Sequence, residues 1–261
     1  MSALHVFDMD GTLLASTAGL EISAALGCRA GVAELEREFA AGRLTTRRFA
    51  AGVHDLWRAL TPEVVARAFR AGPWLDGIAE VCADIRARGE HAAVITLSPD
   101  FFAGLLRGFG FGHVAASAFP PPPMAGPVDP AGILTPECKV RITRALLAGH
   151  GLPAGRCVAY GDSRSDLPLF EALGGGVAVN ADAALAARAF ARYTGRDLRG
   201  AYALARARLD AAPVDAAPVD AAPVDAAPVD AAPVDGGALV DGAPVGGVSL
   251  EGVPLGGPWP G

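Results

Sequence analysis

The sequence predicts a doubly wound α/β fold with a mostly parallel sheet, and two observations lead to that prediction. Short apolar segments alternate with amphipathic helical segments along much of the chain, which is the order of consecutive βα units. In addition, Asp8, Thr96 and Asp162 each stand at the end of an apolar segment. Functional residues of such sheets lie at the carboxyl ends of the strands. We therefore expect four or five βα units with a site at that edge.

The first strand begins at Leu4, and its apolar run ends in two carboxylates. Asp8 and Asp10 are spaced i, i+2, so in extended backbone both side chains project to the same side. Gly11 follows at once and allows the chain to turn sharply away. Because like charges held close together repel each other, the pair indicates that a positive group, most simply a divalent cation, lies between them.

Residues 16–72 lose the strand pattern and predict a helical insert. Glycines and a Thr-Pro pair divide this segment into expected helices at 20–26, 33–41, 45–60 and 62–70. We expect the insert to form a small cap domain, and residues 1–15 with 73–209 to form the catalytic core.

The βα alternation resumes at Asp76. Apolar residues at i, i+3, i+4 and i+7 predict a helix from Ile78, and 91–97 is a continuous apolar run typical of a buried parallel strand. We expect Ser98 to be the N-cap of the next helix, with Pro99 at its first position. Beyond an irregular loop over 119–136, the expected elements are a helix at 136–148, a strand at 157–160, a helix at 166–173, a strand at 176–179 and a last helix at 183–192.

From residue 210 onward the composition changes. Ala-Ala-Pro-Val-Asp occurs five times in tandem over 211–235, and a Gly/Pro/Val-rich segment follows. Proline in every repeat excludes a stable helix, and the small side chains bury too little surface to offset ordering. We expect 210–261 to be a disordered acidic tail.

Composition narrows the function classes. The tail carries seven Asp and one Glu and no basic residue, so the first 209 residues hold 20 acids against 22 bases. That balance argues against a nucleic-acid partner. No apolar run is long enough to span a membrane, and the short N-terminal run is broken by acids, so neither a membrane protein nor a signal peptide is expected. Four widely spaced cysteines suit free thiols in a reducing compartment, and we expect a cytoplasmic protein.

The acids and the chain's only lysine suggest phosphoryl chemistry. Asp8 is the candidate nucleophile, since a carboxylate can attack phosphorus and form an aspartyl-phosphate. Asp10 is the candidate general acid and base. Asp162, with Asp166 four residues on, completes an oxygen site for Mg²⁺ together with the Asp10 backbone carbonyl and water. Lys139 is the one lysine beside 21 arginines, which favours a position that needs a compact ammonium to offset the phosphoryl charge.

The expected phosphate subsite follows the second strand. The Thr96 hydroxyl, together with the neighbouring peptide N–H groups of Leu97 and Ser98, can donate to phosphoryl oxygens at a helix N-terminus. With Lys139, these groups would surround the transferred phosphoryl group.

These residues, in order, resemble the four motifs of the haloacid dehalogenase superfamily. The motifs are Asp8-Met9-Asp10-Gly11-Thr12, Thr96 at a strand end, Lys139, and the segment 161–166 (Gly-Asp-Ser-Arg-Ser-Asp). The resemblance covers about residues 4–195, and it implies that Asp8 and Asp162 are metal ligands and that Asp166 is a supporting carboxylate. It implies a phosphatase or phosphotransferase, since the second motif acid is present, and the insert after the first strand resembles the phosphoserine phosphatase-like branch.

We therefore expect a Mg²⁺-dependent phosphatase of a small phosphorylated metabolite. Phosphoserine-binding residues of that branch are not matched, because Thr17 stands where those enzymes carry Glu and Val53 where they carry the cap arginine. Two alternatives stay open: a phosphotransferase to an acceptor other than water, and a non-catalytic scaffold that displays the acidic tail.

Overall fold

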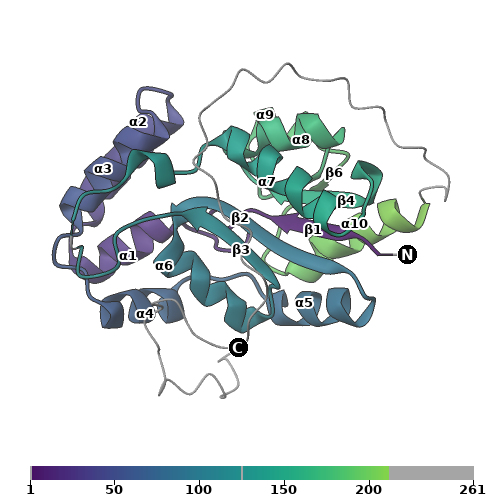
Figure 1. Ribbon diagram of the computed structural model, residues 1–261, viewed down its shortest axis with the longest axis horizontal. Helices are drawn as coiled ribbons and strands as arrows, with labels where there is room; N and C mark the ends of the chain where they lie inside the picture. Colours follow the sequence, from purple (N-terminus) through teal and green to yellow (C-terminus); the bar gives the residue numbers. More distant parts are fainter. Residues whose placement is uncertain (1, 125, 212–261) are drawn as a thin grey trace, which may run out of the picture. The chain divides into compact units, whose positions relative to one another are not determined.

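The computed structural model describes residues 2–124 and 126–211. In this part of the chain six strands form one parallel sheet in the order β3-β2-β1-β4-β5-β6 (Figure 1). The strands are β1 (Leu4–Phe7), β2 (His91–Pro99), β3 (His113–Ser117), β4 (Cys157–Gly161), β5 (Val177–Val179) and β6 (Ala191–Tyr193). The predicted doubly wound α/β fold is confirmed, and β3 and β6 add to the predicted strands. Most of the expected tail, from residue 212 on, lies outside the described residues.

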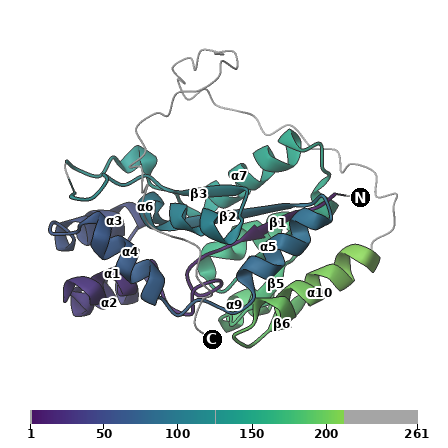
Figure 2. The ribbon, with the colours of Figure 1, turned by 90° about the horizontal axis from the view of Figure 1, so that it is seen from below.

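Helices cover both faces of the sheet (Figure 2). On one face lie α5 (Ile78–Ala87) and α10 (Leu198–Ala211), and on the other lie α7 (Pro136–Gly149), α8 (Leu167–Leu173) and α9 (Ala183–Ala186). Strands β1 and β4 are consequently buried at every residue. This explains why they read as continuous apolar runs without alternation.

Residues 16–72, all of which are described, hold four helices close to the expected positions: α1 (Ala18–Leu26), α2 (Arg29–Ala40), α3 (Thr46–Leu56) and α4 (Pro62–Ala71). The side chains of Thr17, Thr45 and Thr61 cap α1, α3 and α4 by accepting a backbone N–H three residues on. The buried Trp57 indole donates to the Ser23 hydroxyl at 2.7 Å and so ties the end of α3 to α1. That these helices make a separate cap domain stays a prediction.

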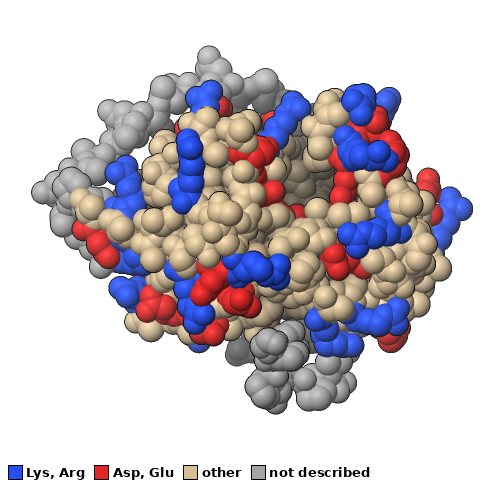
Figure 3. Space-filling model, turned by 180° about the vertical axis from the view of Figure 1, so that it is seen from behind, with Lys and Arg blue, Asp and Glu red and all other residues tan. Residues whose placement is uncertain are grey.

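Charged side chains of both signs are interspersed on the surface in Figure 3. This agrees with the near-neutral balance of the first 209 residues. Among the described residues, no helix is long and apolar enough to cross a bilayer. All four cysteines are free; Cys82 and Cys157 are buried, and Cys28 and Cys138 are half-buried.

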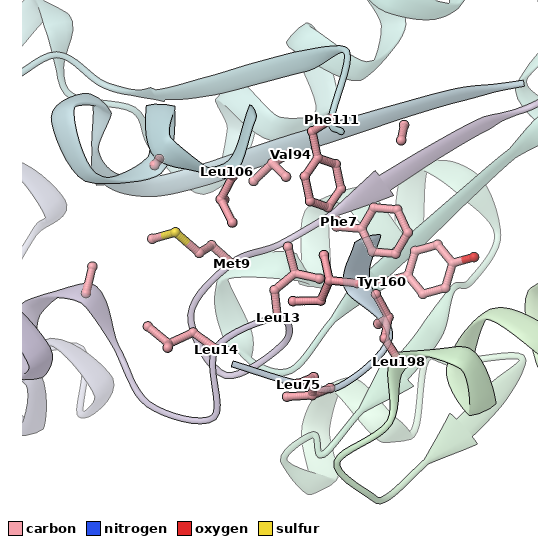
Figure 4. Close-up of a cluster of buried hydrophobic side chains, with 14 of the residues drawn as sticks. Phe7, Met9, Leu13, Leu14, Leu75, Val94, Leu106, Phe111, Tyr160 and Leu198 are labelled. Carbon is pink, nitrogen blue, oxygen red and sulfur yellow. The ribbon is translucent and has the colours of Figure 1, made fainter. Parts of the chain in front are cut away.

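Aromatic stacking between β1 and β4 forms the centre of the core (Figure 4). The Phe7 and Tyr160 rings stack at 4.1 Å between centroids, and Phe111 meets Phe7 edge-on at 5.6 Å. The same apolar cluster continues into the insert through residues such as Ile22 and Trp57. This packing holds the ends of β1 and β4 side by side. It therefore also sets the positions of the residues that directly follow the two strands.

The expected last helix at 183–192 is wrong. Helix α9 ends at Ala186, residues 191–193 form β6, and the chain closes with the longer α10, which runs past the expected tail boundary to Ala211. The buried face of α10 consists of Leu198, Ala201, Tyr202, Ala205 and Leu209, which recur at i, i+3, i+4, i+7 and i+11 as an amphipathic helix requires. Arg206 fixes the helix to the sheet by donating to both Glu90 carboxylate oxygens at 2.8 Å.

Candidate active site

The site lies where the strand order reverses. Strands β2 and β3 lie to one side of β1, and β4 to β6 lie to the other. The crevice at the carboxyl ends of the strands beside such a reversal is the usual ligand site of this fold. Phe7 pairs with Tyr160, and the backbone N–H of Asp8 donates to the Tyr160 carbonyl at 2.9 Å. Asp8 and Asp162 therefore leave adjacent strands side by side.

Lys139 lies between two carboxylates. Its Nζ is 3.0 Å from Asp8 Oδ1 and 2.6 Å from Asp166 Oδ1, and the exposed fractions of Lys139, Asp8 and Asp166 are 1%, 5% and 1%. Burial alone would lower the pKa of Lys139, but the two carboxylates outweigh it and raise that pKa above its ordinary value. The first turn of α7, begun by Pro136, brings Lys139 to this position.

Three carboxylates converge beside this lysine. One oxygen each of Asp8, Asp162 and Asp166 lie within 4.8 Å of one another. Burial, and then the charge of Asp166, raise the pKa of Asp8 well above its ordinary value and that of Asp162 to about 7. Lys139 opposes both shifts but supplies only one positive charge. The cluster therefore has an excess of negative charge, which a divalent cation would compensate.

The hydrogen bonds divide these acids into two kinds. Both oxygens of Asp166 have protein donors: Oδ1 accepts from Lys139, and Oδ2 accepts the backbone N–H of Asp162 at 3.1 Å. By contrast, Asp162 Oδ1 is buried and has no hydrogen-bond partner within the described ranges. An orphaned carboxylate oxygen suits a metal ligand. Asp162 and Asp8 thus fit a hard cation, whereas Asp166 fits a supporting role.

Asp10 makes contacts different from those of Asp8. Its Oδ1 accepts the N–H of Ala18 at the start of α1, at 2.7 Å, and its Oδ2 accepts the hydroxyl of Ser98. Burial raises the pKa of Asp10, and the hydrogen bonds from Ser98 and Ala18 oppose that shift. A raised pKa favours the protonated form of the carboxyl, which is the direction that a general acid requires.

The expected helix start at Ser98 is wrong. Strand β2 runs on to Pro99, and the short α6 (Asp100–Ala103) begins after it. Ser98 cannot cap this helix because Pro99 is the residue before it and the Ser98 hydroxyl is donated to Asp10. Thr96 Oγ1 accepts the N–H of Ser98 at 3.1 Å, and the Leu97 carbonyl accepts the Ser117 hydroxyl at 2.7 Å. The segment 96–98 is thus held beside Asp10.

The structure adds Glu36 and Arg164 to the residues around the site. Glu36 of α2 accepts the Thr17 hydroxyl. Burial, with a contribution from Asp10, raises the Glu36 pKa to about 7, which the hydrogen bond from Thr17 opposes. Arg164 belongs to the loop of Asp162 and Asp166. The sequence gives a signal for Arg164, because it is a basic residue inside an acidic motif. It gives none for Glu36, whose place near the site depends on how the insert folds.

Comparisons with known proteins agree with this arrangement. A sequence model described as haloacid dehalogenase-like hydrolase matches residues 5–171. A probable phosphatase of Mycobacterium tuberculosis is 30% identical over 141 residues, which are 54% of this chain and 45% of that protein. A phosphoserine phosphatase of the same organism is 41% identical over 61 residues, or 23% of this chain and 19% of that one. The chain thus spans about half the length of the first relative, and less of the second.

A solved structure shares the fold over most of the chain. A phosphoserine phosphatase in complex with its substrate has a TM-score of 0.67 and 22% identity to this chain, covering 78% of it and 98% of the solved chain. At that identity the likeness establishes the fold alone.

Proposed function

The chain belongs to the haloacid dehalogenase-like hydrolase family, and within it we propose a Mg²⁺-dependent phosphatase that hydrolyses small phosphate monoesters through an aspartyl-phosphate on Asp8. One observation carries this proposal: buried Asp8 is paired with Lys139 at 3.0 Å and lies beside Asp162, whose Oδ1 has no partner among the described residues. The names of the probable phosphatase and the phosphoserine phosphatase relatives support it.

The first half-reaction forms the phosphoenzyme. A carboxylate oxygen of Asp8 attacks phosphorus as the bond to the ester oxygen breaks, and Asp10 gives its proton to the departing oxygen. Asp8 Oδ1 accepts the Met9 N–H at 2.8 Å and pairs with Lys139, so the carboxylate is oriented before substrate arrives. In the second half-reaction Asp10 takes a proton from water as the water oxygen attacks phosphorus. Phosphate then leaves and Asp8 is regenerated.

The metal site would use Asp8, Asp162 and the main-chain carbonyl of Asp10, with water completing the shell. Mg²⁺ would neutralise charge on the phosphoryl oxygens and on the attacking carboxylate. Asp166 keeps Lys139 in place through the 2.6 Å contact, so that its ammonium group is directed at Asp8.

The phosphate subsite would lie between Lys139 and residues 96–98. The Ser98 N–H already donates to Thr96. The groups that would donate to the phosphoryl oxygens are therefore the Thr96 hydroxyl, the Lys139 ammonium and the Leu97 N–H. These groups stabilise charge that develops on the phosphoryl oxygens, which is the main source of catalysis in phosphoryl transfer. The helical insert would close over the substrate and exclude bulk water.

The direct test is phosphate release from p-nitrophenyl phosphate. We expect activity with Mg²⁺, loss of activity on addition of EDTA, and recovery on addition of excess Mg²⁺. Full activity in EDTA would contradict the metal site. Adding alcohols and measuring phosphorylated alcohol against free phosphate distinguishes hydrolysis from transfer to another acceptor.

Gly11→Ala is expected to lower kcat by about 10²-fold, because misplacing a catalytic group by an ångström costs that much. The φ angle of Gly11 is +74°, and a β-carbon there would overlap the carboxylate of Asp162. Gly27→Ala is the matched control. Gly27 has the same backbone strain, with φ of +77°, but no described atom lies within 4 Å of its β-carbon position. If both variants lose activity equally, backbone strain and not Asp162 is the cause.

A further inference from the structure

We propose that Arg164 selects phosphate esters whose leaving group carries a second anionic group, such as a carboxylate or another phosphate. This inference rests on the proposed phosphatase function and deepens it by naming a substrate class. It concerns a residue that takes no part in the two half-reactions.

Arg164 reaches from the acidic loop to the helical insert. It stands midway between Asp162 and Asp166, both of which contribute to the carboxylate cluster. Its Nη1 lies 2.9 Å from the position that a β-carbon would take on Gly42, in the turn between α2 and α3. One arginine side chain therefore bridges the space between the loop of Asp162 and the insert. Figure 3 shows the surface hollowed on one face, with Lys, Arg, Asp and Glu side chains around the hollow.

The guanidinium of Arg164 has no paired side chain. Within residues 2–124 and 126–211, no carboxylate lies within 4 Å of it, and it donates no hydrogen bond. Neighbouring Arg43 differs, since its Nε and Nη2 donate to the two carboxylate oxygens of Glu38 at 2.8 and 2.7 Å. An exposed guanidinium with five free donors is suited to bidentate binding of a carboxylate or phosphate.

The position of Arg164 favours the leaving group over the transferred phosphoryl group. Asp8 and Lys139, which would contact the phosphoryl group, are 5% and 1% exposed, whereas Arg164 is exposed and its tip touches the insert. In this proposal, substrate atoms outside the phosphate subsite extend between the core loop and the insert. A second anion there would meet the guanidinium and gain more from it than a neutral group would.

The experiment compares matched pairs of esters. One pair is 4-carboxyphenyl phosphate and 4-carbamoylphenyl phosphate; the other is phosphoglycolate and its amide. The members of each pair differ in charge but little in shape. In Arg164→Ala we expect the ratio of kcat/KM for acid over amide to fall by about tenfold in at least one pair, the loss of one charge-assisted contact. Arg164→Lys should restore part of the ratio, and added salt should reduce the difference between wild type and Arg164→Ala.

Arg43→Ala is the matched control, because it removes a paired arginine beside the same turn and should leave the ratio unchanged. The inference is overturned if the ratio in Arg164→Ala stays within twofold of wild type for both pairs, or if acid and amide lose kcat/KM equally, which would make Arg164 a latch for the insert. Failure of the wild-type protein to hydrolyse any of the four esters or p-nitrophenyl phosphate would instead contradict the proposed function itself.

Discussion

Asp8→Asn is expected to reduce phosphate release from an aryl phosphate by at least about 10³-fold in kcat, as for other enzymes that lose their nucleophile. An amide has nearly the shape of the carboxylate but is far less nucleophilic. The fold should survive, because Lys139 keeps its 2.6 Å contact with Asp166. The measurements are steady-state kinetics with Mg²⁺ and thermal unfolding of both proteins.

The control for this variant is Asp100→Asn. Asp100 directly follows β2, at the same edge of the sheet as Asp8. Its carboxylate accepts hydrogen bonds from the N–H groups of Phe101 and Phe119 at 2.8 and 3.3 Å. An asparagine oxygen can accept both hydrogen bonds, so activity should stay within about twofold of wild type. Retention of full activity by Asp8→Asn would mean that Asp8 is not the nucleophile.

Lys139→Met is expected to have the largest effect on stability. The methionine fills the space but leaves Asp8 and Asp166 facing each other without the cation that lies 3.0 and 2.6 Å from them. Removing one partner of a buried ion pair costs about 3–5 kcal/mol. We expect a loss of that size in the free energy of unfolding near pH 7 in EDTA, and a fall in kcat of about 10²-fold or more with Mg²⁺.

The pH dependence of this loss has a defined sign. In the wild-type protein the pKa of Asp8 is raised by burial and Lys139 opposes that shift, so removing Lys139 raises this pKa further. The added penalty therefore appears above the wild-type folded-state pKa of Asp8 and grows with pH. The stability difference from wild type should therefore be smallest near pH 4. Arg88→Met removes an exposed pair with Asp84 and should leave the free energy of unfolding almost unchanged, because solvent screens such pairs. An equal loss in both variants would argue against a buried cluster.

Lys139→Arg tests why this position holds a lysine in a chain whose other basic side chains of this kind are all arginine. The Lys139 ammonium is 1% exposed and has two carboxylates and the Ser165 hydroxyl around it. A planar guanidinium is larger and cannot direct its donors in the same way. We expect this variant to recover part of the stability and little of the activity; full recovery of both would show that charge alone matters.

Strand pairing brings together the residues that were read from the sequence. Asp8 and Asp162 follow strands that pair directly in the sheet, and Lys139 stands in the first turn of a helix packed against it. In a parallel sheet the carboxyl ends of adjacent strands lie at the same edge, so these positions can be predicted without knowing the conformation of the loops. The same is true of the four insert helices, whose glycine and proline boundaries are local signals.

Contacts between residues far apart in the chain could not be predicted from the sequence pattern. The contact between Gly42 and Arg164 joins two segments far apart in the chain, and no periodicity specifies it. The sequence around Ser98 is typical of a helix N-cap. In the structure, however, its hydroxyl donates a hydrogen bond to Asp10, which follows strand β1. Strand β6 gives little sequence signal because it has three residues and none of them is fully buried. Helix α10 is different, since its buried residues recur at helical spacing and the pattern could have predicted it.

The most direct test of the central claim is to trap the phosphoenzyme. The wild-type protein is mixed with Mg²⁺ and an aryl phosphate, quenched in acid at a series of times, digested and analysed by mass spectrometry. The account predicts one phosphoryl group on the peptide that contains Asp8, and none in Asp8→Asn. A phosphoryl group on another residue, or rapid hydrolysis with Asp8 unmodified at every quench time while Asp8→Asn remains active, would contradict it.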